Sequence, residues 1–147
     1  MRFYSYDPGH TTGWALFEND NLISAGESED WKDIRWQLEN TTVGFVLFEE
    51  FKLYPWKAKH KSWDTFVEIE VIGVIKEYCW YNGIKIVSQI PAQKDFFDNK
   101  KLERIYGKFS SSRHAKDAVR HGLVYLTFGE GKSLGYGQDI LRRVKKD

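Results

Sequence analysis

Three acidic residues, far apart in the chain, each follow or lie in an apolar segment that would hold them rigidly. Asp7 closes the run 2–6, Glu49 closes the run 43–48, and Asp117 lies within a helical pattern. Carboxylates are the hard oxygen ligands that Mg²⁺ prefers, and a phosphodiester undergoing hydrolysis needs such ions because its negative charge grows in the transition state. The three acids therefore predict a two-metal phosphodiesterase site, with Asp7 bridging both ions.

Two neighbours of these acids leave choices open. His114 precedes Asp117 by one helical turn, so it shares that helix face and is either a metal ligand or a group that assists proton transfer. Glu50 is the rival of Glu49, because the phase of a strand is not fixed by sequence alone. His121 lies near the same face as His114 but two turns away, where a packed or surface histidine is expected.

The elements that must position these residues alternate between strands and helices. Asp7 precedes the turn formers Pro8 and Gly9, which places it at a strand end, and Gly13 permits close approach of backbone or phosphate. Strands are predicted at 2–7, 12–18, 21–26, 43–49 and 84–88, and helices at 30–39, 64–81 and from 113 to 126. Short helices and a mobile loop are expected over 91–113. Beyond Leu126 the glycines at 129, 131, 135 and 137 predict broken structure that leaves a short basic tail at 142–146.

Length and composition limit the number of domains, the expected location and the expected partners. The 147 residues form one ordinary domain, and the single cysteine, Cys79, offers neither a disulfide nor a metal cluster. The N-terminal segment lacks the apolar core of a secretion signal, and no stretch is long and apolar enough to span a membrane, so a cytoplasmic protein is expected. Net charge is +1, but acids dominate between Glu18 and Glu39 while basic residues gather around the predicted site. That asymmetry suits a polyanion bound on one face.

The segment 51–63 mixes lysines with aromatic residues directly after Glu49. One interpretation is that its aromatic side chains pack over the sheet while the lysines solvate it. The other is DNA binding, with lysines on phosphates and an aromatic ring stacked on unpaired bases. A second basic stretch leads into the helix that carries Asp117. The candidate DNA-binding residues are Phe51, Lys52, Tyr54, Lys57, Lys59, Lys61, Lys94, Lys108 and Arg113.

Three motifs together carry a family resemblance. Asp7-Pro8-Gly9 with Thr12-Gly13, an acid ending an apolar strand, and His114-x-x-Asp117-Ala118 resemble the RuvC-type Holliday-junction resolvases, in particular their phage-encoded branch. The resemblance spans Asp7 to about Leu126, and the motifs occur in the family's order. It implies a ribonuclease H-like α/β fold: a mixed five-stranded sheet, three antiparallel strands first, flanked by helices.

The resemblance also implies a function and a site. The expected activity is that of a crossover junction endodeoxyribonuclease, which acts in DNA recombination and repair and resolves four-way junctions with two Mg²⁺ or Mn²⁺ ions per site. Asp7, Glu49, His114 and Asp117 would be both the catalytic and the metal-binding residues. Some relatives carry aspartate where His114 stands, which leaves the metal preference open. The expected setting is the cytoplasm of a bacterial host cell.

A homodimer is expected because the helix 64–81 is apolar around more than one face. Such a dimer would place two active sites on opposed strands of a junction. Other functions also fit the motifs: a ribonuclease H-type, flap or debranching nuclease, or a non-catalytic module that binds junction DNA. A kinase-like ATPase also opens with an Asp-Gly hairpin, but one small domain leaves no cleft for a nucleotide.

Overall fold

The computed structural model describes residues 1–50, 63–110 and 112–145, without the side chains of residues 63–65 and 92. A five-stranded sheet with the order β3-β2-β1-β4-β5 forms its centre. The strands are β1 (Arg2–Asp7), β2 (Thr12–Glu18), β3 (Asn21–Ser28), β4 (Phe45–Glu49) and β5 (Lys85–Gln89). β1, β2 and β3 pair antiparallel, and β4 lies parallel to both β1 and β5. This is the mixed sheet that the sequence predicted.

Alternation along the strands divides the core into two layers. Phe3, Phe17 and Phe45 face one side of the sheet, and Tyr6 and Phe48 face the other. Successive residues of a strand point to opposite faces, so the continuous apolar run of β4 is buried on both sides.

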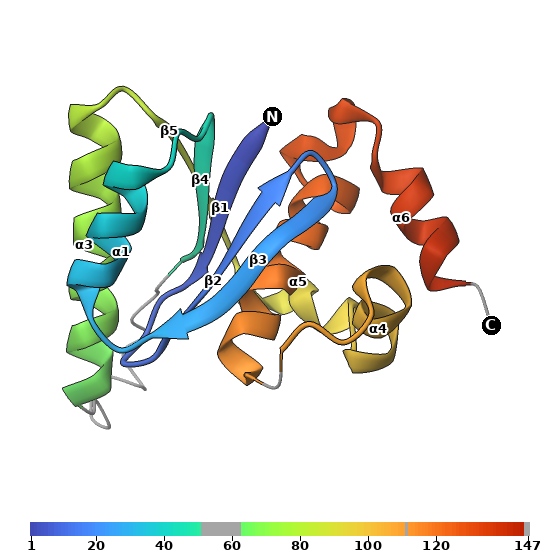
Figure 1. Ribbon diagram of the computed structural model, residues 1–147, viewed down its shortest axis with the longest axis horizontal. Helices are drawn as coiled ribbons and strands as arrows, with labels where there is room; N and C mark the ends of the chain where they lie inside the picture. Colours follow the sequence, from blue (N-terminus) through green and yellow to red (C-terminus); the bar gives the residue numbers. More distant parts are fainter. Residues whose placement is uncertain (51–62, 111, 146–147) are drawn as a thin grey trace.

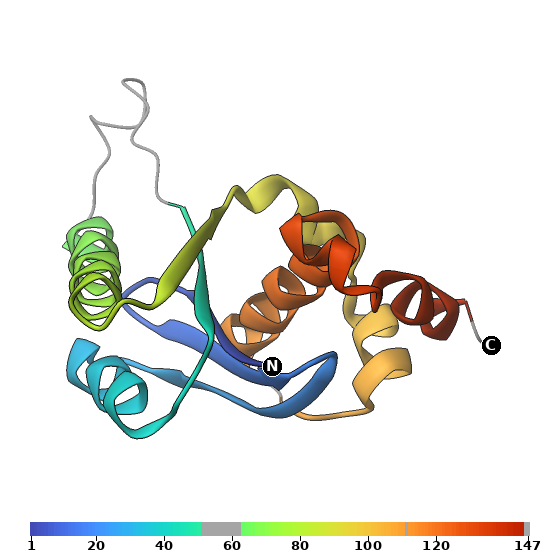
Figure 2. The same ribbon diagram turned by 90° about the horizontal axis from the view of Figure 1, so that it is seen from above.

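Helices cover both faces of the sheet (Figures 1 and 2). α1 (Trp31–Asn40) and α3 (Trp63–Tyr81) lie side by side on the face of Tyr6, and α5 (Arg113–Phe128) crosses the face of Phe3. The remaining helical segments, on the α5 side, are η1 (Pro91–Phe96), α4 (Asn99–Tyr106), η2 (Glu130–Leu134) and α6 (Gly137–Val144). Among the helices that the structure describes, none combines the length and apolar character needed to cross a bilayer.

Local signals set the helix ends close to the predicted positions. Asp30 caps α1 by accepting a hydrogen bond from the Lys32 amide, and Ser112 caps α5 by accepting one from the Ala115 amide. α3 ends just before Gly83, whose φ of +66° is a left-handed conformation that glycine adopts without strain. The short helices expected between 91 and 113 are η1 and α4.

The C-terminal segment corrects one prediction. The stretch expected to be broken structure with a basic tail folds into η2 and α6, and Ile140 and Val144 of α6 are buried. Arg143 of the supposed tail pairs with Asp20 at 2.6 Å, next to the β2–β3 turn. The glycines were interpreted as helix breakers, but Gly137 begins α6 where a Cβ atom would lie 3.2 Å from the Cα atom of Thr127.

Helix α5 rests directly on the backbone of the sheet. A Cβ atom built at Gly13 of β2 would lie 1.8 Å from the carbonyl oxygen of His114, so no larger residue fits there. Farther along, a Cβ atom at Gly122 would lie 2.4 Å from the ring of Phe17. Between these points the Ser5 hydroxyl donates a buried hydrogen bond of 2.7 Å to the carbonyl of Ala118. The first turn of α5 is thus held by hard contact with β2.

We expect Gly13→Ala to lower the free energy of unfolding by about 1–3 kcal/mol or more, because strand and helix must separate to admit the methyl group. Gly73→Ala is the matched control. A Cβ atom at Gly73 of α3 meets nothing within 4 Å, so this change should stabilise the helix by up to about 1 kcal/mol. Urea unfolding of both variants tests the contact, and equal stabilities would contradict it.

Candidate active site

The ends of two neighbouring strands place two carboxylates together. Asp7 is the last residue of β1 and Glu49 the last residue of β4, and the parallel register pairs Tyr6 with Phe48 just before them. Both acids therefore emerge at the same edge of the sheet. The turn after Asp7 is closed by Thr12, whose hydroxyl donates to the Gly9 carbonyl at 3.1 Å.

Helix α5 brings its own polar residues to this edge. His114, Asp117 and His121 recur at intervals of three and four residues, which places them on one face of the helix. The Nδ1 atom of His114 lies 3.9 Å from Oδ2 of Asp7. The Nε2 atom of His121 lies 2.8 Å from Oε2 of Glu49, in the buried floor of the site.

Asp7, Glu49 and His121 form a group that could hold a metal ion. One ligating atom from each lies within 4.8 Å of the other two. Gln89 of β5 contacts the other ring nitrogen of His121, Nδ1, at 3.2 Å, so the imidazole is held from both sides. Such an outer contact fixes the orientation of a ligating histidine.

Two cations contact the acids of the site. The Nζ atom of Lys94, from η1, lies 3.4 Å from Oε2 of Glu49 and 3.6 Å from Oδ2 of Asp117. Arg120 donates to Oδ1 of Asp117 at 2.7 Å, to the Phe97 carbonyl at 2.7 Å and to Asn99 at 2.5 Å. Each oxygen of Asp117 thus faces a different cation.

The acids perturb one another strongly. Burial, a hydrogen bond to Glu49 and the charge of that carboxylate together raise the pKa of Asp7 to about 8, against the opposing effect of Lys94. Burial also acts to raise the pKa of Glu49, but hydrogen bonds from His121 and Asp7 outweigh it and lower the pKa to about 2. At neutral pH the pair therefore shares a proton, with Glu49 carrying the negative charge.

An open, polar cleft connects this group to solvent. Glu68 of α3 also lines the cleft, and burial together with the charge of Glu49 raises the pKa of Glu68 to about 7. The residues that line the cleft are Asp7, Pro8, Gly9, His10, Thr11, Glu68, Lys94, Arg113, His114 and Asp117.

The structure brings together all four predicted catalytic residues. Of the two candidates at the end of β4, it is Glu49 whose carboxylate contacts His121. His114 and Asp117 line the cleft but lie outside the close group formed by Asp7, Glu49 and His121.

His121 was not predicted from the sequence to belong to the site. Two helical turns separate it from His114, about 10 Å along the axis, and that distance suggested a position outside the site. The structure instead buries it beneath Glu49. The seven-residue spacing, which keeps both histidines on one face, was the available signal. Glu68 and His10 carried no comparable signal in the sequence.

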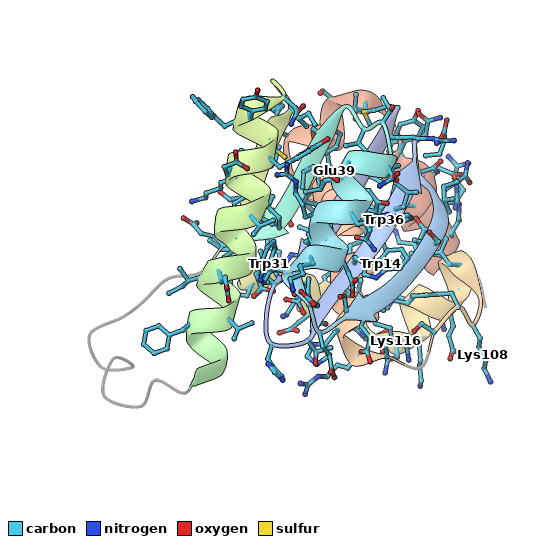
Figure 3. The ribbon with its side chains drawn as sticks, turned by 60° about the vertical axis from the view of Figure 1, so that its left-hand side comes forward. Trp14, Trp31, Trp36, Glu39, Lys108 and Lys116 are labelled. Carbon is cyan, nitrogen blue, oxygen red and sulfur yellow. The ribbon has the colours of Figure 1, made fainter. Side chains whose placement is uncertain are left out.

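The predicted DNA-binding residues fall into three groups. Lys94 and Arg113 line the cleft. Lys108 is exposed, and Figure 3 shows it projecting from the same lower edge of the molecule as Lys116. The loop residues Phe51, Lys52, Tyr54, Lys57, Lys59 and Lys61 lie outside the described residues.

Solved structures share this fold, whereas the sequence matches no family model and no curated protein. RuvC from T. thermophilus in complex with a Holliday junction substrate aligns with a TM-score of 0.64 at 13% identity, covering 82% of this chain and 89% of that chain. A second Thermus thermophilus RuvC structure gives a TM-score of 0.63 at 14% identity, covering 82% and 90%. The fowlpox virus resolvase in complex with substrate Holliday junction DNA gives 0.58 at 20% identity, covering 84% and 97%.

At these identities the likeness establishes the fold. The chain has the ribonuclease H-like fold of RuvC-type resolvases, and the fold predicted from the sequence is confirmed. The match covers more than four fifths of this chain in each case, which is far more than the strands of the sheet alone.

The donor set fits a divalent cation. Two carboxylates and one imidazole suit Mg²⁺ or Mn²⁺, with the imidazole better suited to the softer Mn²⁺. Burial is the main cause of the raised pKa of Asp7, and repulsion from Glu49 and Asp117 adds to it. A bound cation would offset both effects.

We expect Asp7→Asn to raise the melting temperature of the metal-free protein at pH 8. The folded-state pKa of Asp7, about 8, exceeds its ordinary value of 3.8. The folded protein therefore loses stability as pH rises between these values, and asparagine removes the loss. The advantage should shrink toward pH 4, and Mg²⁺ should reverse it at pH 8 by stabilising only the wild type.

The control for this prediction is Glu29→Gln, which removes one negative charge from an exposed position between β3 and α1. Thermal unfolding at several pH values should show little change for it. An Asp7→Asn protein that melts at or below the wild-type temperature at pH 8 without metal would refute the proposed repulsion.

Proposed function

We propose that this protein is a metal-dependent, structure-selective DNA endonuclease that resolves four-way junctions and other branched DNA. One observation carries the proposal: Asp7, Glu49 and His121 meet with ligating atoms within 4.8 Å of one another, beside His114 and Asp117, on a resolvase-type fold. Two of the neighbours with this fold, RuvC from T. thermophilus and the fowlpox virus resolvase, were determined with Holliday junction DNA.

In this proposal the acids at the strand ends hold two Mg²⁺ or Mn²⁺ ions. Asp7, Glu49 and His121 would hold one ion, and Asp117 and His114, beside Asp7, would help to hold the other. Bound divalent ions would supply an activated water and neutralise the charge that develops on the scissile phosphodiester. His121 enters this set beside the four residues predicted from the sequence.

The chain's own residues provide the remaining functions. Gln89 orients the His121 ring, and Arg120 fixes the Asp117 carboxylate. Arg113, on the rim of the cleft, is placed to contact a phosphate of the bound strand. Lys108, exposed beyond the cleft, would contact the backbone of the same DNA farther from the cut.

The proposed assembly is a homodimer formed through α3. Val71, Ile72 and Ile75 of this helix are buried against the sheet, yet Phe66 and Ile69 are 51% and 43% exposed on its outer side. Figure 3 shows this outer side of α3 uncovered beside α1. A two-fold contact there would present two sites to opposed strands of a junction.

The first test is cleavage of a labelled four-way junction, compared with linear duplex and an RNA–DNA hybrid, in Mg²⁺ or Mn²⁺. We expect paired nicks on the junction, reduced about 100-fold or more by Asp7→Asn or Glu49→Gln, because each removes charge that stabilises the transition state through the ions. Glu50→Gln is the matched control and should retain most of the activity.

Three other outcomes would contradict the proposed activity or one of its residue assignments. Junction binding without metal-dependent cleavage would indicate a DNA-binding module. Preferential cleavage of the hybrid would indicate a ribonuclease. Activity lost in Glu50→Gln and kept in Glu49→Gln would show that the wrong acid had been assigned.

For the dimer, we expect the wild type to sediment as a dimer and Ile69→Lys to sediment mainly as a monomer, since burying an unpaired ammonium group in an interface is unfavourable. Ile23→Lys, on the edge strand β3, introduces the same charge at a position that is 52% exposed and should remain dimeric. Analytical ultracentrifugation distinguishes these states, and a monomeric wild type at micromolar concentration would exclude this interface.

A further inference from the structure

Lys94 occupies the centre of the acidic site. Its ammonium lies 3.4 Å from Glu49 and 3.6 Å from Asp117, and its charge also acts on Asp7 and on Glu68 across the cleft. Burial acts to lower the pKa of Lys94, but the charges of Glu49, Asp117 and Asp7 together raise it. The ammonium is therefore held by several carboxylates together rather than by a single ion-pair partner.

The backbone that carries Lys94 is held in place, while its side chain remains long and flexible. Lys94 lies in η1, and its carbonyl accepts a 3.1 Å hydrogen bond from the amide of Phe97, which is fully buried. The side chain lines the same cleft as Arg113, where a DNA phosphate would enter. The ammonium can therefore exchange between the carboxylates and a phosphate without movement of the fold.

Lys94 fills the gap between Glu49 and Asp117, where it contacts the same Oε2 atom of Glu49 as His121 does. The group of Asp7, Glu49 and His121 is assembled with the ammonium present. Arg120 already holds Oδ1 of Asp117, so Oδ2 is the oxygen that faces Lys94. An ammonium and a divalent ion would repel each other in the same gap between Glu49 and Asp117.

We propose that Lys94 is an exchangeable counter-ion that keeps the gap between Glu49 and Asp117 closed to a divalent cation until a DNA phosphate draws its ammonium away. Cation binding by Asp117 is thereby coupled to the arrival of substrate. This inference rests on the proposed function, because it assumes that Asp117 takes a divalent ion during the reaction.

A purely structural ion pair would behave differently when Lys94 is removed. In that case Lys94→Gln would lower stability and leave cation binding unchanged or weaker. In the proposed arrangement the same substitution removes a competing positive charge, so it lowers the stability of the metal-free protein and strengthens cation binding. The direction of the change in cation affinity therefore distinguishes an exchangeable counter-ion from a purely structural ion pair.

The experiment is a Mn²⁺ titration of the DNA-free protein in which electron paramagnetic resonance measures the free ion. We expect the wild type to bind one Mn²⁺ more tightly than the second, and Lys94→Gln to bind the second on the order of tenfold more tightly. Lys100→Gln, the same change at an exposed position of α4, should match the wild type. An unchanged or weaker second Mn²⁺ in Lys94→Gln would overturn the inference.

A second measurement uses the wild type alone and decides the question if Lys94→Gln does not fold. Mass spectrometry after brief amine acylation should show greater modification of Lys94 at Mn²⁺ concentrations high enough to fill the second, weaker site, with Lys100 unchanged, because the second ion then displaces the ammonium. Equal or lower modification would overturn the inference.

Asp7→Asn distinguishes failure of this inference from failure of the proposed function. If Asp7→Asn binds Mn²⁺ as well as the wild type does, both the proposed function and this inference are contradicted. If Mn²⁺ binding depends on Asp7 but not on Lys94, only the role of Lys94 is contradicted.

Discussion

The contact between the backbone of β2 and the first turn of α5 determines the geometry of the site. Gly13 pairs with Asp7 across β1 and β2, and the same glycine leaves no room for a Cβ atom beneath the carbonyl of His114. One position therefore joins the strand end that carries an acid to the helix that carries the other polar residues. Positioning through backbone contact leaves little freedom for misplacement, which catalysis penalises heavily.

This geometry concentrates negative charge that the fold itself does not need. Asp7 and Glu49 at neighbouring strand ends, with Asp117 nearby, oppose the stability of the free protein, as the raised pKa of Asp7 indicates. A core selected for stability alone would contain apolar residues at these positions. These unfavourable acids lie together at one edge of the sheet, and a local cost in stability of this kind marks a functional site.

The sequence predicted the parts of the structure that depend on local periodicity. Strand ends at Asp7 and Glu49, the helical phase of Asp117 and the buried run of β4 follow from alternation, turn residues and spacing. Contacts between distant segments were not predictable in this way. His121 reaches Glu49 across the core, and α6 forms because Arg143 and Ile140 find partners elsewhere in the fold. Glycines judged locally as breakers instead permit close packing.

The two cations at Asp117 differ in how firmly they are held, and this difference gives the carboxylate a defined orientation. Arg120 is planar and bonds three acceptors at 2.5–2.7 Å, so it fixes Oδ1. Lys94 approaches Oδ2 only to 3.6 Å from a flexible stem. A divalent ion competes far more readily with the looser contact. The firmly held partner is therefore Arg120 and the loosely held one is Lys94, which lines the cleft, as the proposed binding of both cations and phosphate requires.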